Sequence, residues 1–280
     1  MAELLIDKLS VSFPTPSGPV RVVKSLSLRM GAERIGIVGE SGSGKSMTAR
    51  AILGLVQPPG RVSAQRLQFD GIDLTRQSAA GWRALRGRRI AMILQDPKFS
   101  LNPVLPVGRQ IAEAGLLHGV FGRRDARRRV LDMLETVGVH EPQRVFHAYA
   151  HQLSGGIGQR VMIAAMMIAS PSLLIADEPT SALDVMVRSQ VLDMMDREIR
   201  KRGMGLLMIS HDLNMVAGFC DRVLVMYRGA VVDSCAASEL FQSRHPYTQG
   251  LLNCLPTGAQ RGRKLATIDR AAIDRATELE

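Results

Sequence analysis

The sequence predicts an α/β fold built on a parallel β-sheet, with a block of helices inserted between two of its strands. Short apolar runs at 34–38, 173–176 and 205–210 have the length and composition of buried parallel strands. Helical patterns separate these runs, and strands that alternate with helices are typical of a parallel sheet. A long helical stretch from Val107 to about Arg160 indicates the inserted block.

The N-terminal third begins with strand patterns. Residues 3–13 alternate in the manner of a strand, 14–19 form a proline- and glycine-containing loop, and 20–29 read as a second strand. After the strand at 34–38, residues 47–55 are rich in helix formers, and two prolines and a glycine end that helix. Residues 66–74 predict a strand with a turn in it.

The remaining elements follow from shorter patterns. We expect a strand at 89–95, an apolar helix at 161–170, a patterned helix at 185–202 closed by Gly203, a short helix at 213–220 and a hairpin over 222–233. The stretch after Gly258 is basic and then rich in Ala and Glu, without a core pattern. We therefore expect one domain over 1–257, with a helical subdomain at about 96–160, and a C-terminal tail at 258–280.

Length and charge limit the possible functions. A chain of 280 residues is one large domain or two small ones. Its net charge of +10 and its pI of about 10.2 suggest an acidic partner such as nucleic acid, anionic lipid or nucleotide phosphate. Much of the excess lies in two arginine clusters, at 83–89 and 123–129, where no aromatic residues interleave to stack bases. This favours solvated helix faces over a nucleic-acid surface.

Cysteine usage points to a reducing compartment, and the apolar runs are too short to predict a membrane span. The three cysteines, Cys220, Cys235 and Cys254, match no metal-binding spacing and predict buried or free thiols. The N-terminus carries charge within its apolar stretch, unlike a signal peptide. The longest apolar run, 161–169, is less than half of the ~20 residues that cross a bilayer. We expect a soluble protein, or one held at a membrane by another molecule.

Residues 39–46 fit the pattern G-x-x-x-x-G-K-[ST] of a phosphate-binding loop, or P-loop, between a strand and a helix. Glycines let successive N–H groups turn toward phosphate oxygens, and the following helix N-terminus favours negative charge. Lys45 would neutralise β- and γ-phosphate charge, and the Ser46 hydroxyl would bind Mg²⁺. The predicted nucleotide-binding residues here are Gly39, Glu40, Ser41, Gly42, Ser43, Gly44, Lys45 and Ser46.

Two carboxylates follow the buried strand at 173–176. Ligands of open α/β sheets bind beyond the carboxyl ends of the strands, so Asp177 and Glu178 are aimed at the nucleotide. Asp177 is placed to hold Mg²⁺, directly or through water, and Glu178 to orient and deprotonate an attacking water.

The stretch Leu153-Ser-Gly-Gly-Ile-Gly-Gln-Arg160, just before that strand, resembles the LSGGQ signature of ATP-binding-cassette (ABC) ATPases. Further motifs of the family stand in the expected order: Gln95 resembles the Q-loop glutamine, 179–184 contains the D-loop, and His211 resembles the switch histidine. Phe13 is a weaker match for the residue that stacks on adenine. The sequence departs from many relatives at Ile157-Gly158 and at Ala150, without losing a proposed phosphate contact.

The resemblance, over about residues 3–255, implies a P-loop NTPase ABC-type nucleotide-binding domain with an antiparallel β subdomain and an inserted helical subdomain. Such ATPases bind ATP and Mg²⁺ and dimerise head to tail, so Ser154, Gly155 and Gly156 of one subunit would face the γ-phosphate held by the other. Gln95 would contact Mg²⁺ or the attacking water, and His211 would contact the γ-phosphate and hold Glu178.

Three segments, 39–46, 95–103 and 244–252, resemble the oligopeptide/dipeptide/nickel importer branch. This implies an ATPase at the cytoplasmic face of the bacterial inner membrane, with a second ATP-binding subunit, identical or different, two permease subunits and a periplasmic solute-binding protein. No iron–sulfur cluster is expected, because no cysteine follows Cys254. The alternative is a DNA-repair or ribosome-associated ATPase of the same superfamily, which would explain the high pI. The single cassette, without heptads between Lys45 and Ser154, favours the transporter.

Overall fold

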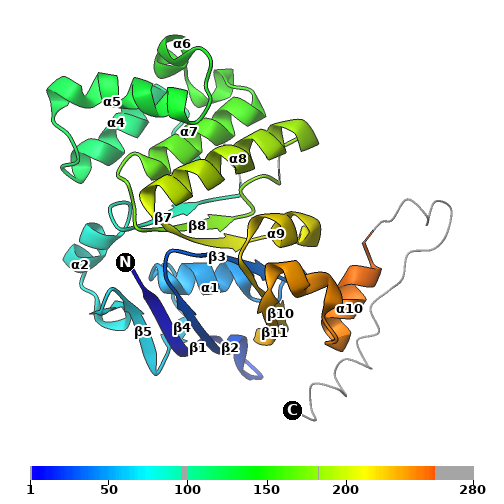
Figure 1. Ribbon diagram of the computed structural model, residues 1–280. Helices are drawn as coiled ribbons and strands as arrows, with labels where there is room; N and C mark the ends of the chain where they lie inside the picture. Colours follow the sequence, from blue (N-terminus) through cyan, green and yellow to red (C-terminus); the bar gives the residue numbers. More distant parts are fainter. Residues whose placement is uncertain (1, 96–99, 182, 256–280) are drawn as a thin grey trace. The chain divides into compact units, whose positions relative to one another are not determined.

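The computed structural model describes residues 2–95, 100–181 and 183–255. The expectations for the tail at 258–280, for residues 96–99 and for Ala182 of the D-loop lie outside the described residues. The chain divides into two compact units. Figure 1 labels the helices and strands of both. The first unit comprises Met1–Leu4, Arg29–Glu33 and Gln68–Met208, and the second comprises Leu5–Leu28, Arg34–Leu67 and Ile209–Glu280.

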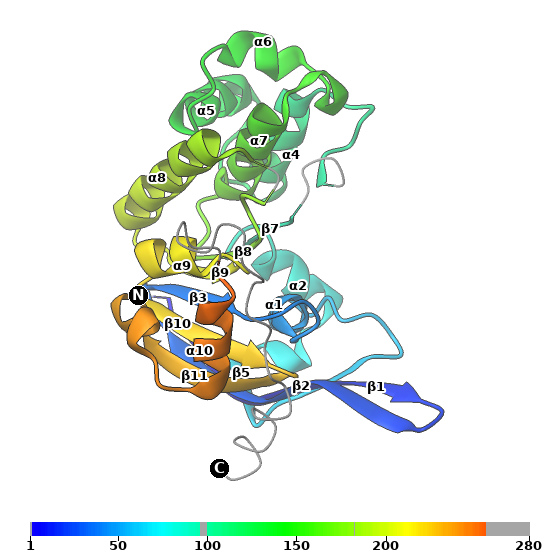
Figure 2. The same cartoon turned by 90° about the vertical axis from the view of Figure 1, so that its right-hand side faces the viewer.

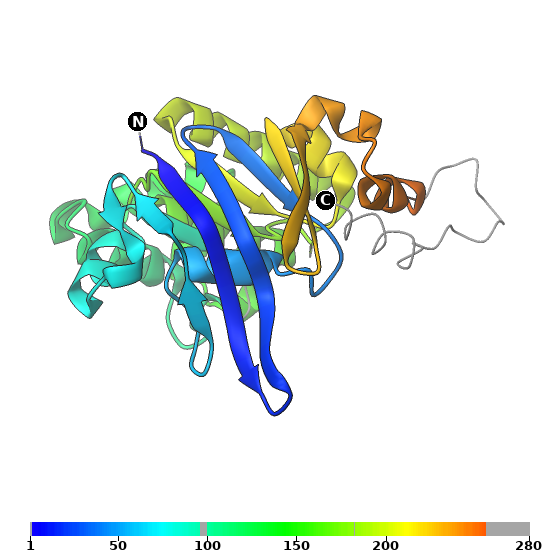
Figure 3. The same cartoon turned by 90° about the horizontal axis from the view of Figure 1, so that it is seen from below.

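Two long strands of the second unit, β1 (Leu4–Thr15) and β2 (Gly18–Met30), lie side by side (Figure 3). The short strand β4 (Arg61–Ser63) pairs antiparallel with β1. The loop predicted at 14–19 is much shorter in the structure, because both strands continue into it. The Thr15 hydroxyl donates to the Gly18 carbonyl at 2.6 Å, and Gly18 takes φ +109°, so a tight turn joins the strands.

The second unit also holds β3 (Arg34–Val38), which is parallel to β10 (Arg222–Tyr227). Strand β11 (Ala230–Ala236) forms the predicted hairpin with β10. Helix α1 (Lys45–Ile52) follows β3 in the chain. Helix α9 (Leu213–Phe219) packs on β3. The helix α9 approaches so closely that a Cβ on Gly36 would lie 2.3 Å from Val216 Cγ1. After β11, the described part of this unit contains the 3-10 helix η3 (Ala237–Gln242) and α10 (Pro246–Asn253).

Three strands of the first unit are hydrogen-bonded in the order β9 (Gly205–Ile209), β8 (Leu173–Asp177) and β7 (Ile90–Ile93). The pair β7 and β8 is parallel, with Ile90 opposite Leu173 and Ile93 opposite Ala176. All five residues of β9 and the first four of β8 are buried, which explains their uninterrupted apolar sequence. The predicted strand at 66–74 is a hairpin of β5 (Arg66–Phe69) and β6 (Ile72–Asp73), and η1 (Leu74–Arg76) and α2 (Ala79–Leu85) follow.

The helical insertion lies between β7 and β8 in the chain (Figure 2). Helices α4 (Val107–Leu117), α5 (Arg123–Thr136) and α6 (Pro142–His147) pack on one another, and α4 and α5 also contact α7 (Gly155–Met167). The short 3-10 helix η2 (Ala150–Gln152) precedes α7. Among the described residues, no helix combines the length and the apolar character that crossing a bilayer requires.

Helix α8 (Val185–Arg202) has the predicted bounds. The Asp184 side chain accepts from the Val187 N–H at 3.0 Å at its start, and Gly203 ends it in the left-handed conformation with φ +60°. At the end of α8, Arg202 pairs with Glu198 at 2.7 Å and donates to the carbonyl of Met167, the last residue of α7, at 2.9 Å. The hydrogen bond from Arg202 to Met167 therefore joins the ends of α8 and α7, and the ion pair with Glu198 holds the guanidinium in place.

Candidate functional site

The loop at 39–46 connects β3 to α1 in the second unit and is folded around Lys45. The Lys45 ammonium is buried and donates to the carbonyls of Gly39 at 2.8 Å and Glu40 at 2.7 Å, and it lies 3.4 Å from Ser43 Oγ. The lysine is thus held over the concave side of its own loop. A ligand with strong acceptor oxygens can compete for these donors, because hydrogen bonds to charged acceptors are stronger than those to carbonyls.

Two glycines of the loop are required by its backbone. Gly39 has φ +148°, and a Cβ on it would lie 2.2 Å from the Met226 carbonyl oxygen. Gly44 has φ +103°, and a Cβ there would lie 2.5 Å from the Val22 carbonyl oxygen. Since both obstacles are main-chain atoms, only glycine allows the loop to turn here. The pattern of glycines in the sequence therefore has a direct steric reason.

The loop opens onto the N-terminus of α1, which suits an anion. Gly44 is its N-cap and forms no side-chain cap, and no acidic residue stands in the first turn. Ser46 lies in that first turn and is half-buried, whereas Ser41 and Gly42 are exposed. Backbone N–H groups at a helix start, a lysine and a hydroxyl form the donor set that phosphate requires. The predicted phosphate site is therefore assembled from one continuous segment.

The acidic strand end belongs to the first unit. Asp177 is the last residue of β8, and Glu178 follows it with φ +50°, in the left-handed region that costs a non-glycine residue about 1–3 kcal/mol. The Ser181 hydroxyl and N–H bond the Glu178 carbonyl at 3.1 and 3.3 Å and hold this turn. The strain turns the main chain sharply at the residue that we expect to act on water.

Gln95 lies beside Glu178, as the register of the strands dictates. Ile93 pairs with Ala176. Gln95 lies two residues after Ile93, and Glu178 lies two residues after Ala176. Gln95 Nε2 donates to Glu178 Oε2 at 3.4 Å. The amide therefore orients the carboxylate, and both groups stand at the carboxyl ends of parallel strands, where ligands of such sheets bind.

The signature-like stretch begins α7. Ser154 is its N-cap and is exposed, and its hydroxyl accepts from the Ile157 N–H at a long 3.4 Å. Gly155 is exposed as well, and Gly156 is half-buried. These residues thus offer a second helix N-terminus, with a hydroxyl, on the surface of the first unit.

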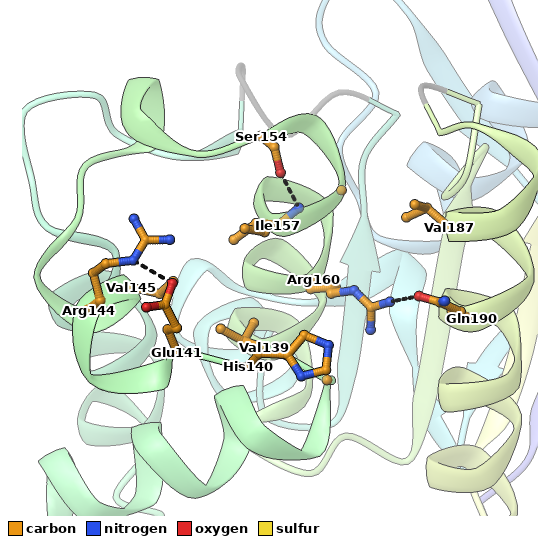
Figure 4. Close-up of a pocket in the computed structure, with 12 residues that line it drawn as sticks. Val139, His140, Glu141, Arg144, Val145, Ser154, Ile157, Arg160, Val187 and Gln190 are labelled. Atoms are coloured by element: carbon orange, nitrogen blue, oxygen red, sulfur yellow. Dashed lines mark hydrogen bonds and ion pairs between the residues drawn. The ribbon is translucent and has the colours of Figure 1, made fainter.

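A cavity of about 290 Å³ lies next to Ser154 (Figure 4). Arg160 spans it, donating to the Val137 carbonyl at 2.6 Å and to Gln190 Oε1 at 3.0 Å, which ties α7 to α8 and to the end of α5. Burial lowers the pKa of the Arg160 guanidinium. The remaining walls come from residues 138–145 and from α7 and α8: Gly138, Val139, His140, Glu141, Arg144, Val145, Gly156, Ile157 and Val187.

No role was predicted for Gln159, although it lies within residues 153–160, which resemble the signature. Its side chain is 1% exposed, and its Nε2 donates to the carbonyl of Pro179, the residue after Glu178. Gln159 stands between Gly158 and Arg160, so no local pattern marked it as buried, although a buried amide needs a partner. No role was predicted for Tyr247 either, whose hydroxyl oxygen accepts from the Glu40 N–H at 3.1 Å.

The two remaining predicted residues lie in the second unit with the P-loop. His211 is exposed and follows β9, in the turn where Asp212 N–H donates to Ser210 Oγ at 3.0 Å. Phe13 stands near the end of β1 and is half-buried; its ring packs on Gly60, where a Cβ would lie 2.7 Å from Phe13 Cε1. The structure thus gathers the P-loop residues in one unit and Gln95, Asp177, Glu178 and the signature in the other.

A P-loop between strand and helix, an acidic strand end with a neighbouring glutamine, and a signature at a helix start together define an ATPase cassette. The ABC transporter family model matches residues 23–181. The chain belongs to the ABC transporter family. The expected α/β fold of that family is confirmed.

ATP-binding proteins of several transporters are similar to nearly the whole chain. It is 48% identical over 271 residues to the dipeptide transport ATP-binding protein DppD of Escherichia coli, which covers 96% of this chain and 83% of the relative. It is 41% identical over 267 residues to the oligopeptide transport ATP-binding protein OppD of Bacillus subtilis, covering 94% and 75%. The glutathione import ATP-binding protein GsiA of Shigella flexneri is 42% identical over 268 residues, or 92% of this chain and 43% of that protein.

Solved structures share the fold. The ATP-binding cassette MJ0796, a dimer bound to ADP and Pi, has a TM-score of 0.73 at 24% identity and covers 85% of this chain and 99% of its own. The cbiO1 component of the cbiONQ transporter from Clostridium perfringens has a TM-score of 0.70 at 26% identity, covering 85% and 92%.

Proposed function

We propose that this chain is the ATP-hydrolysing subunit of a bacterial ABC importer for peptides. The observation that carries the proposal is the 48% identity over 96% of the chain to a dipeptide transport ATP-binding protein, together with a P-loop folded around Lys45. The other relatives have names that refer to oligopeptides and glutathione, which are also peptides. None of these three names refers to nickel, the other solute that the sequence suggested.

The P-loop residues Gly39 to Ser46 hold the phosphates of ATP. Lys45 leaves its two carbonyl acceptors in part and bonds phosphate oxygens, while N–H groups at the start of α1 bond the rest. The ring of Phe13 is the candidate for contact with adenine, although its present packing on Gly60 requires that the base approach its open face.

The residues also fit Mg²⁺, since a hydroxyl, a carboxylate and an amide oxygen are the oxygen donors that this ion prefers. Ser46, Asp177 and Gln95 would hold it. A bound Mg²⁺ would offset phosphate charge during transfer.

Glu178 is the base that orients and deprotonates the attacking water. Gln95 holds one of its carboxylate oxygens, and the left-handed turn at Glu178 sets the direction of the side chain. His211 contacts the γ-phosphate and steadies Glu178, which its exposed position at the end of β9 allows.

A second subunit completes the site. Ser154, Gly155 and Gly156 serve the nucleotide of the neighbouring subunit in a head-to-tail dimer, which requires that they be accessible, and Ser154 and Gly155 are exposed. The partner is a second copy or a related ATP-binding subunit. Two permease subunits hold the pair at the cytoplasmic face of the inner membrane, and a periplasmic protein supplies the solute. We assign the cassette to 1–257, its helical subdomain to about 96–160, and the tail to 258–280.

Co-expression with the candidate permease and solute-binding subunits tests this function. The chain should copurify with the permease, and ATP hydrolysis in proteoliposomes should rise when the binding protein is loaded with di- or oligopeptide. Loading with Ni²⁺ should have no effect. Copurification with rRNA or DNA in place of membrane subunits would refute the proposal.

A further inference from the structure

The segment Ser243–Asn253 has no part in the proposed binding and hydrolysis of ATP, although residues 244–252 resemble the importer branch. It contains α10, which starts with Pro246 at a position where its missing N–H is harmless. The helix belongs to the second unit, as does the P-loop. Several of its polar side chains, those of Ser243, His245 and Thr248, fix its start.

Asp233 on β11 anchors this start. Its Oδ2 accepts from the Ser243 hydroxyl at 2.5 Å and from the Thr248 hydroxyl at 2.7 Å, so one carboxylate oxygen holds both sides of the turn into α10. His245 Nδ1 accepts from the Tyr247 N–H at 3.2 Å and caps the helix. These bonds fix the position of Tyr247, which lies between them in the sequence.

Tyr247 points into the interior, where its side chain is 0% exposed and its ring lies 4.4 Å from that of Tyr227 between centroids. Its hydroxyl oxygen accepts a hydrogen bond of 3.1 Å from the backbone N–H of Glu40. Glu40 is the second residue of the P-loop. The C-terminal helix therefore bonds directly to the main chain of the nucleotide loop.

The bonded peptide unit is also the one that Lys45 holds. The carbonyl of Gly39 and the N–H of Glu40 belong to the same peptide group. Lys45 Nζ donates to that carbonyl at 2.8 Å, and Tyr247 Oη accepts from that N–H at 3.1 Å. Hydrogen bonds at both ends of one peptide polarise and strengthen each other. Gly39 has no side chain and takes φ +148°, which other residues rarely adopt, so these two hydrogen bonds help to fix the peptide.

We propose that Tyr247 is a positioning residue of the nucleotide site, and that Ser243–Asn253 is the device that places it. The phenol oxygen fixes the peptide between Gly39 and Glu40, and this peptide sets the resting position of Lys45 and the entrance to the phosphate loop. The inference rests on the proposed binding of ATP at this loop. It adds a C-terminal element to a site otherwise built from the loop itself.

The test replaces Tyr247 with Phe in the full chain, which removes one oxygen and keeps the ring. Amide hydrogen exchange of the nucleotide-free protein should rise at least severalfold in peptides covering residues 39–44. The Kd for a fluorescent ATP analogue should rise about three- to tenfold, the range expected for one hydrogen bond. The matched control is Leu240→Ala, which removes a buried side chain from η3 in the same unit. It should lower the melting temperature and leave the Kd and the exchange of residues 39–44 unchanged.

Three results would overturn the inference. One is a Tyr247→Phe variant that binds the analogue within twofold of the unaltered chain, with unchanged exchange at 39–44. Another is a Leu240→Ala control that weakens binding as much as Tyr247→Phe does, since the effect would then follow from general destabilisation. If the unaltered chain binds no nucleotide, the proposed function fails, and the positioning role fails with it.

Discussion

Two glycines of the P-loop provide a matched test of its geometry. Gly42 and Gly44 both hold positive φ, at +82° and +103°. A Cβ on Gly42 would meet nothing within 4 Å, whereas a Cβ on Gly44 would lie 2.5 Å from the Val22 carbonyl oxygen. An alanine adds the same methyl group at a positive φ in both positions, and the contact with the Val22 carbonyl exists at Gly44 only.

The expected costs follow from these contacts. A left-handed conformation costs a non-glycine residue about 1–2 kcal/mol, which applies to both variants. At Gly44 the overlap with a main-chain oxygen adds about 1–3 kcal/mol, the usual cost of overpacking. We therefore expect Gly44→Ala to unfold at a temperature at least about 2 °C below that of Gly42→Ala, using about 2–4 °C per kcal/mol for a chain of this size.

Thermal unfolding of the nucleotide-free chain, followed by circular dichroism, measures the difference. The absence of nucleotide is essential, because ligand binding would add its own stabilisation and differ between the variants. Equal melting temperatures, or a lower one for Gly42→Ala, would refute the assignment of Gly44 as the sterically restricted position.

Further predictions concern catalysis, packing and thiol reactivity. Glu178→Gln should lower kcat for ATP hydrolysis by about 10²–10⁴-fold and leave nucleotide affinity within twofold; near-normal turnover would exclude Glu178 as the base. Arg202→Met should destabilise the chain by about 2–4 kcal/mol in urea unfolding, because it strands the buried Glu198 carboxylate, and adding Glu198→Leu should restore part of the loss. Burial raises the pKa of Cys220 to about 12, so its thiol stays protonated at pH 8 and should escape iodoacetamide until the chain unfolds; mass spectrometry that finds rapid labelling of native Cys220 would contradict this.

The elements with strong local signals were predictable from the sequence. Helix α8 has the predicted bounds because Asp184 caps its start and the left-handed Gly203 ends it. Strands β8 and β9 were predictable because they are buried on both faces and, apart from Asp177 at the end of β8, consist of apolar residues. In these cases the local sequence and the packing favour the same conformation.

Other elements depend on contacts that no local pattern reveals. Strand β4 has three exposed residues and exists because it pairs with β1. Helix α10 was missed because its cap is a histidine, and its position depends on Asp233, which is distant in the sequence. The continuation of β1 and β2 through the predicted loop likewise depends on pairing between the strands.

The candidate site shows the same division. The P-loop was predictable because its glycines, lysine and serine lie within eight residues of the sequence. Each of these residue types is required there for a steric or an electrostatic reason. The proximity of Gln95 to Glu178 follows from the pairing of β7 with β8, which the sequence does not state. The roles of Gln159 and Tyr247 come from single long-range hydrogen bonds to main-chain atoms, and such bonds leave no periodic trace in the sequence.

The hydrogen bond from Gln159 to the Pro179 carbonyl would couple ATP hydrolysis at the two sites of a dimer. Its donor stands on the helix that begins with Ser154, and its acceptor directly follows Glu178. In a head-to-tail pair that helix would face the neighbour's nucleotide, whereas Glu178 would act on the chain's own. A movement of α7 when the neighbour's nucleotide binds or leaves would therefore displace Glu178, which acts on the chain's own nucleotide. In the proposed dimer, two sites linked in this way would not hydrolyse ATP independently of each other.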